Sequence, residues 1–180
     1  MEELLDILNE KGEKTGETRT IHEAHLYGLW HRSIHVWFLN SKGQLLLQKR
    51  SKNMEACPLH WDISAAGHIS SGRSSLETAK IETEEELGLS LPETDFQYLF
   101  TVKEKFILNG GAYINNEFDD LYLVRSDLTP SEFKLSADEV EEVRWISIEE
   151  LKKWIKDDQE LLVPHYEEYE KLIEYLSKNY

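Results

Sequence analysis

Three glutamates, Glu82, Glu85 and Glu86, lie in a stretch that carries signals for a helix at both ends. At about 100° per residue, a helix places these carboxylates within one arc of roughly 100°. Like charges at this spacing repel one another, so the arrangement costs stability unless a cation binds. Mg²⁺ and Mn²⁺ prefer oxygen ligands, and a metal held by clustered carboxylates usually serves phosphate chemistry. The stretch therefore predicts a helix that carries a divalent metal site.

The limits of this helix are marked by its flanking residues. Ser74 and Glu77 form the S-x-x-E pattern of a capping box, which predicts the start of the helix, and Gly88 is predicted to end it. A core-facing stripe is expected on another arc, made by Leu76, Ala79, Thr83 and Leu87. The alternative interpretation of the glutamates is a solvated face of an acidic protein, because charge runs are usually only solvated surface.

The whole run from Gly67 to Leu89 resembles the Nudix box, the loop–helix signature of the Nudix hydrolases. That signature reads G, five residues, E, seven residues, and then R-E-U-x-E-E-x-G-U, where U is a bulky aliphatic residue. The matching positions are Gly67, Glu82, Glu85, Glu86, Gly88 and Leu89. The resemblance implies that Gly67 and the three glutamates hold Mg²⁺ or Mn²⁺, and that Glu82 is a catalytic base.

Three positions depart from this signature. Arg73 stands in place of the first Glu, Ile81 in place of the Arg, and Thr83 in place of the first aliphatic residue. In the family, the first two positions brace the site and help to orient the catalytic glutamate. The metal ligands are thus retained and the brace is lost, which leaves normal, weakened or absent turnover open. Arg73 could repel metal, or contact a substrate phosphate or one of the glutamates.

Roughly residues 3 to 150 resemble the Nudix subgroup related to isopentenyl-diphosphate isomerase. Such isomerases have a catalytic Cys directly before the Gly that opens the box, and here this residue is Ala66. Asn116-Glu117 matches an N-E pair of the isomerases, which makes Glu117 a second candidate for a base or a metal ligand. The isomerases also use a histidine cluster for a second metal, and three residues lie at comparable places: His25, His31 and His68.

Other polar residues near the box are candidates for binding the substrate. Lys49 and Arg50 end a predicted strand near the box loop and could meet a diphosphate, or they could be solvated charges at a strand end. His68 follows the box glycine and could bind metal or phosphate, whereas a lone His beside a turn is more often an ordinary hydrogen-bonded residue. His35 is expected to be packed in the sheet.

Composition narrows the classes of partner. The 180 residues predict one domain, residues 1–180, and the net charge of −15 argues against a nucleic acid polymer, because phosphate backbones attract basic surfaces. A metal can still bring a small diphosphate into an acidic site. The single cysteine, Cys57, cannot form an internal disulfide, which favours the cytoplasm. We expect no membrane span and no signal peptide, and a homodimer stays possible.

The chain alternates between strand and helix patterns. Strands are predicted at residues 3–9, 34–39, 44–50, 61–66, 95–108, 118–125 and 142–146. Helices are predicted at residues 19–27, 74–88, 147–156 and, opened by Pro164, at about 164–178. This order predicts an α/β fold, a Nudix-type α/β/α sandwich with a mixed β-sheet between helices.

These expectations combine into one predicted function. The chain is expected to be a Mg²⁺-dependent hydrolase that cleaves a diphosphate linkage in a nucleoside diphosphate derivative or a small organic diphosphate. An isomerase on the same scaffold is one alternative, and Ala66 argues against it. A catalytically weakened diphosphate-binding protein is the other, and Arg73 and Ile81 argue for it.

Overall fold

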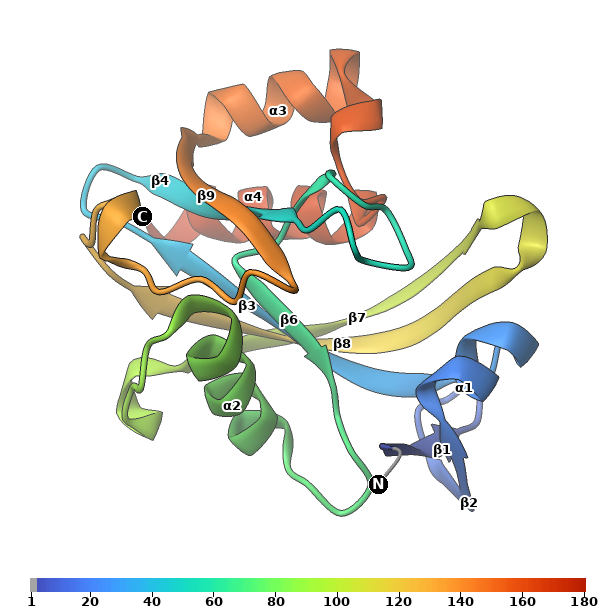
Figure 1. The fold of residues 1–180 in the computed structure, drawn as a ribbon. Coiled ribbons are helices and arrows are strands. Elements are labelled where there is room, and N and C mark those ends of the chain that lie inside the picture. The colour runs from blue at the N-terminus through green and yellow to red at the C-terminus, as the bar shows by residue number, and fades with distance from the viewer. Residues whose placement is uncertain (1–2) are drawn as a thin grey trace.

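The computed structural model describes residues 3–180, and its centre is a mixed sheet of seven strands. The strands are β1 Leu4–Leu8, β2 Lys14–Thr20, β3 His31–Leu39, β4 Gln44–Arg50, β5 Trp61–Asp62, β6 Ala65–His68, β7 Gln97–Leu108, β8 Tyr113–Arg125 and β9 Val140–Ser147. The α-helices are α1 Ile21–Tyr27, α2 Ser75–Leu87, α3 Ile148–Asp157 and α4 Tyr166–Asn179. The sheet runs in the order β5-β4-β3-β8-β7, with β6 also paired to β3 and β9 to β4 (Figure 1).

Strand β3 is the centre of this sheet and is buried along nearly its whole length. It runs parallel to β8 and antiparallel to β4 and β6, so both of its faces need cover. Trp37 and Leu39 belong to a core with residues of α3 and α4, whereas the alternate residues Val36 and Phe38 belong to a second core with residues of α2. The predicted α/β/α sandwich is confirmed: α2 lies on one side of the sheet and α3 and α4 on the other (Figure 1).

Several element boundaries differ from those predicted. Strand β2 was not expected, because its sequence KTGETRT is polar and has no apolar alternation. Helix α1 begins at Ile21, not residue 19, because Thr20 caps it: Thr20 Oγ1 accepts from the Glu23 amide at 3.2 Å and Glu23 Oε2 accepts from the Thr20 amide at 3.1 Å. Strand β8 begins at Tyr113, five residues before the predicted 118, because its polar first half pairs with β7.

Helix α2 begins and ends at the predicted residues. Ser74 Oγ accepts from the Glu77 amide at 3.3 Å, but within residues 3–180 Glu77 makes no return bond, so only half of the predicted capping box forms. Gly88 has the left-handed conformation (φ 69°) that ends the helix. Strand β6 leads into the loop before α2, and α2 packs against β6, so the box glutamates lie beside Gly67 and His68.

The remaining elements bring distant residues to the same region. A second sheet, β1 paired with β2, packs with α1 beside the start of β3, and the long β7–β8 hairpin extends past α1 (Figure 1). No helix within residues 3–180 combines the length and the apolar character required to cross a bilayer.

Candidate functional site

The box glutamates open onto a cavity of about 390 Å³ between α2, β6, the β7–β8 hairpin and the start of α4. Seven carboxylates line it: Glu3, Asp62, Glu82, Glu85, Glu86, Glu117 and Glu139. The cationic side chain that faces them is Arg50, together with the imidazoles of His35, His68 and His165. The excess of carboxylates over cations gives the cavity wall a net negative charge, which favours cations over anions.

Gly67 is a glycine because Glu82 occupies the space beside it. A Cβ atom placed on Gly67 would lie 2.2 Å from Glu82 Cδ and 2.5 Å from Glu82 Cγ, far inside van der Waals contact. Gly67 does not have a left-handed backbone, so its requirement for glycine is steric and not conformational. The Glu82 carboxyl group therefore lies against the β6 backbone at Gly67, so the two predicted metal ligands are neighbours.

Glu86 is fixed by two hydrogen bonds. Its Oε2 accepts from the Ala66 amide and from Gln48 Nε2, each at 3.1 Å, and the residue is only 6% exposed. Burial and the neighbouring Glu82 raise the pKa of Glu86 well above its usual range. Burial and the charge of Glu85 likewise raise the pKa of Glu82 to about 8. These shifts show that the cluster favours added positive charge, either as protons or as a cation.

The donor set of α2 fits a hard divalent cation. Glu82, Glu85 and Glu86 offer only carboxylate oxygens, the ligands that Mg²⁺ and Mn²⁺ prefer. Two of the three carboxyl groups carry the electrostatic cost that a bound cation would relieve. The structure therefore places the predicted metal-binding residues at the wall of one cavity, with the donor type that Mg²⁺ and Mn²⁺ prefer.

Four further residues form a second group that could hold a metal. The ligand atoms of His25, His31, His68 and Glu117 all lie within 4.8 Å of one another. His31 Nε2 lies 2.9 Å and His68 Nε2 lies 3.1 Å from Glu117 Oε1, and the two Nε2 atoms of His25 and His68 are 3.1 Å apart. Burial and the charge of His68 lower the pKa of His25 to about 4. His25 is therefore neutral near pH 7, and neutral imidazole is the form that binds metals.

The same contacts make Glu117 a weaker candidate for a general base than Glu82. Its Oε1 faces His31 and His68, and its Oε2 accepts from Asn115 Nδ2 at 2.7 Å. Although burial opposes ionisation, the hydrogen bonds and charges of His31 and His68 hold the pKa of Glu117 well below its usual range. A carboxylate with both oxygens occupied and a low pKa binds protons poorly, whereas the pKa of Glu82, about 8, suits a base near neutral pH.

Of the two basic residues that end β4, the structure brings only Arg50 to the cavity. Arg50 Nη1 donates to Asp62 Oδ2 at 2.8 Å and Arg50 Nε donates to the Ala56 carbonyl at 3.0 Å. Lys49 lies outside the cavity, because it pairs with Glu142 at 3.2 Å and lies over the ring of Trp61. The prediction that Lys49 meets the diphosphate is not supported by this geometry.

Arg73 is half-buried in the loop before α2 and does not line the cavity. Its charge acts on Glu82 at a distance: burial and Glu85 raise the pKa of Glu82, and Arg73 offsets a small part of that rise. Ile81 is half-buried and likewise does not line the cavity.

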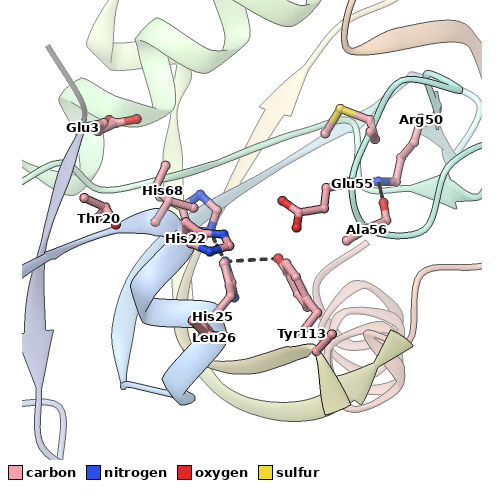
Figure 2. A pocket seen from close by; sticks show the side chains of 13 residues that line it. Glu3, Thr20, His22, His25, Leu26, Arg50, Glu55, Ala56, His68 and Tyr113 are labelled. Atoms are coloured by element: carbon pink, nitrogen blue, oxygen red, sulfur yellow. Dashed lines mark hydrogen bonds between the residues drawn. The ribbon is translucent and has the colours of Figure 1, made fainter. Parts of the chain in front are cut away.

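A neighbouring cavity of about 380 Å³ shares Arg50, His68 and Tyr113 with the first. Figure 2 shows its walls, with Glu55 reaching from the loop after β4 toward His68 and with Tyr113 beside His25. The Tyr113 hydroxyl lies 3.1 Å from His25 Nε2, so the same tyrosine contacts the histidine cluster and faces both cavities.

Several residues of the cavity were missed from the sequence. They are Asp62, Tyr113, Glu139 and His165. Each lies in a segment without a motif, and none has a spacing relative to the box that would mark it. The only available signal was their residue type, which does not distinguish a residue of the site from the same residue elsewhere in the chain. His35, expected to be packed, is buried with its Nδ1 at 2.5 Å from Glu168 Oε2, and it also borders the cavity.

Comparisons with known proteins identify the family of the chain. A model of the NUDIX domain matches residues 29–166. The chain is 41% identical over 167 residues to Nudix hydrolase 3 of Arabidopsis thaliana, in a match that spans 91% of this chain and 22% of that protein. It is 38% identical over 146 residues to an uncharacterized Nudix hydrolase of Listeria monocytogenes, covering 81% of this chain and 80% of the relative.

More distant comparisons concern the isomerases and the fold. The chain is 30% identical over 145 residues to the isopentenyl-diphosphate Delta-isomerase of Pectobacterium atrosepticum. The crystal structure of a Deinococcus radiodurans protein matches with a TM-score of 0.71 at 24% identity and covers 99% of both chains, which supports the fold.

Proposed function

This chain belongs to the NUDIX domain family, and we propose that it is a Mg²⁺- or Mn²⁺-dependent hydrolase that cleaves a diphosphate linkage in a nucleoside diphosphate derivative or a small organic diphosphate. The observation that carries this proposal is the cavity in which Glu82, Glu85 and Glu86 face Arg50. Carboxylates there suit a cation, and a guanidinium suits a phosphate. An isomerase is not favoured, because the catalytic cysteine position holds Ala66 and the isomerases are more distant relatives.

The residues of the cavity take distinct roles in this proposal. Glu82, Glu85 and Glu86 would hold the cation, which when bound supplies charge neutralisation on the diphosphate and a lower pKa for an attacking water. Glu82, which loses its own proton when the cation binds, would accept the proton that the water loses as it attacks phosphorus. Arg50 and His68 bind phosphate oxygens of the substrate, and Asp62 holds the Arg50 guanidinium in place at 2.8 Å.

We infer the partners and the compartment from composition. A net charge of −15 favours a small-molecule diphosphate over a nucleic acid polymer. A single cysteine among 180 residues is typical of proteins in a reducing compartment, and we propose that this protein acts in the cytoplasm.

An activity screen tests the proposed function. The full chain is incubated with a panel of nucleoside diphosphate derivatives and small organic diphosphates, with Mg²⁺ or with a chelator, and released phosphate and monophosphates are measured. We expect release from at least one diphosphate in Mg²⁺ only. Saturable binding of a diphosphate without release would instead support the weakened binding protein, and conversion of isopentenyl diphosphate to its allylic isomer would support an isomerase.

Metal binding is expected to release protons and to strengthen as the pH rises toward 8. Burial and Glu85 raise the pKa of Glu82 from 4.5 to about 8, so the folded protein carries a proton there that a cation must displace. Calorimetry of Mg²⁺ binding in buffers of different ionisation enthalpy measures this release. The Glu82→Gln variant should release fewer protons.

The same shift predicts how stability depends on pH without metal. Between 4.5 and about 8 the folded state binds more protons at Glu82 than the unfolded state does, so this group makes the free energy of unfolding fall as pH rises. Saturating Mg²⁺ should remove the fall. Metal affinity that is constant with pH, without proton release, would contradict the raised pKa.

Restoring the two signature positions is expected to increase hydrolysis. Arg73→Glu adds a carboxylate near Glu82, and Ile81→Arg adds its partner cation. Either change alone leaves a charge without its intended partner, so the effects of the two substitutions on kcat should be coupled. The kcat of the double variant should exceed the value expected from adding the two single effects. A double variant slower than the native protein would show that Arg73 contributes positively to turnover.

A further inference from the structure

We propose that His165 binds the substrate directly, with its Nε2–H donating to a phosphate oxygen beside Arg50. This inference rests on the proposed function, because it assigns a residue to the diphosphate subsite of the same cavity. His165 precedes α4, far along the chain from the box, and lines the cavity although it is only 6% exposed.

One side of the His165 ring is already occupied. Its Nδ1 donates to Glu104 Oε2, and Glu104 on β7 is itself only 5% exposed. A buried carboxylate on Nδ1 fixes the orientation of the ring and leaves the Nε2 edge for another partner.

The other nitrogen of the ring has no hydrogen-bond acceptor among the described residues. Its nearest carboxylate atom is Asp62 Oδ1 at 3.5 Å, which is beyond the usual range of an N–H···O bond. Asp62 has other donors, since its Oδ1 accepts from the Ile63 amide and its Oδ2 from Arg50 Nη1, each at 2.8 Å. His165 Nε2 thus makes a long ion-pair contact with Asp62 but no hydrogen bond among the described residues, and it lies next to the Arg50 ion pair.

The charge of His165 suits an anionic partner. Burial opposes its charged form, but the carboxylates of Glu104 and Asp62 raise the pKa of His165 to about 9, so the ring is an imidazolium at neutral pH. The other titratable groups that face it are His35, whose Nδ1 pairs with Glu168, and the ring of Tyr169. Within residues 3–180 only Glu104 accepts a hydrogen bond from His165, so its Nε2–H can still donate to an anionic ligand.

A phosphate oxygen is the acceptor that this position favours. A charged N–H donor forms its strongest hydrogen bonds with an anionic oxygen. Arg50, on the other side of Asp62, is a second charged donor of this kind. Two cations that share one carboxylate can bind one phosphate group between them.

Two substitutions test the contributions of the two ring nitrogens separately. In His165→Asn the amide N–H replaces Nδ1–H, so the contact with Glu104 is kept and the cavity donor is lost. In His165→Gln the longer side chain places its N–H near the position of Nε2, so a donor toward the cavity is kept. The probe is imidodiphosphate with Mg²⁺, since it resists hydrolysis and contains no organic group, and calorimetry measures its Kd. We expect His165→Asn to weaken binding roughly tenfold or more, and His165→Gln to weaken it less.

A measurement on the native protein does not depend on whether the variants fold. In ¹⁵N-histidine NMR spectra, the Nε2 resonance of His165, assigned by its absence in His165→Asn, should shift when imidodiphosphate and Mg²⁺ are added. The affinity of the native protein should also fall as the pH rises through about 9, because the imidazolium loses its charge. Glu104→Gln should move that fall to lower pH, which a purely structural role of His165 would not do.

The outcomes distinguish this inference from the proposed function. If imidodiphosphate binds the native protein but binds His165→Asn equally well and leaves the Nε2 resonance unchanged, the inference is wrong and the proposed function stands. If the native protein does not bind imidodiphosphate with Mg²⁺, the proposed function fails and the inference fails with it.

Discussion

Glu86→Gln is expected to reduce diphosphate hydrolysis on the order of 100-fold and to weaken Mg²⁺ binding, because a metal supplies several kcal/mol of transition-state stabilisation and Glu86 is the most buried of its three candidate ligands. Glutamine has nearly the same shape and keeps an oxygen that can accept from the Ala66 amide and Gln48. The loss should therefore come from the missing charge and not from altered packing. Steady-state kinetics and calorimetry of Mg²⁺ binding measure the two effects.

Glu84→Gln is the matched control for this variant. Glu84 lies on the same helix, is exposed and does not line the cavity, so the substitution changes the net charge by the same amount without touching the site. Without metal, Glu86→Gln should also melt at a higher temperature than the native protein, because burial and Glu82 disfavour the Glu86 carboxylate. Equal Mg²⁺ affinity in the two variants would remove Glu86 from the set of ligands.

Gly67→Ala is expected to remove most of the activity and to cost about 1–3 kcal/mol of stability. The added Cβ would lie 2.2 Å from Glu82 Cδ, so either the Glu82 carboxyl group or the β6 backbone must move. Displacement of Glu82 removes the candidate base and a candidate metal ligand in one step. Thermal denaturation and the diphosphate assay measure the losses in stability and in activity.

A double-mutant cycle tests whether Glu82 is the cause. In a Glu82→Ala background the clash is gone, so Gly67→Ala should cost much less stability than it does in the native protein. Gly16→Ala serves as the control for a general glycine effect: Gly16 has a left-handed backbone (φ 90°) with nothing within 4 Å of its added Cβ. It should lose stability through backbone strain and leave hydrolysis unchanged. An equal cost of Gly67→Ala in both backgrounds would exclude the steric explanation.

The part of the site that could be predicted is the part that is local in sequence. Gly67, Glu82, Glu85 and Glu86 lie within one loop and one helix, so a fixed spacing and the periodicity of the helix suffice to place them together. Ser74 and Gly88 mark the helix ends for the same reason, since caps act on the nearest turns.

The two residues at the end of β4 show where local reasoning stops. Both Lys49 and Arg50 were candidates for contact with the diphosphate, but adjacent side chains of a strand point to opposite faces. Lys49 pairs with Glu142 over Trp61, and Arg50 turns to Asp62 and the cavity. Only the register of β4 with its neighbours decides which of the two faces the site, and that register is a property of the sheet.

The sequence alone determined the loop–helix that presents the carboxylates, because hydrogen bonds and side-chain spacing within one short segment specify it. The tertiary structure decided which distant groups complete the site. Parallel pairing of β3 with β8 brings Glu117 beside His31, and the packing of α4 against the sheet places His165 near Asp62. These pairs are separated by 86 residues and by 103 residues in sequence (165 − 62), and their contacts depend on how buried faces pack, which no local pattern encodes.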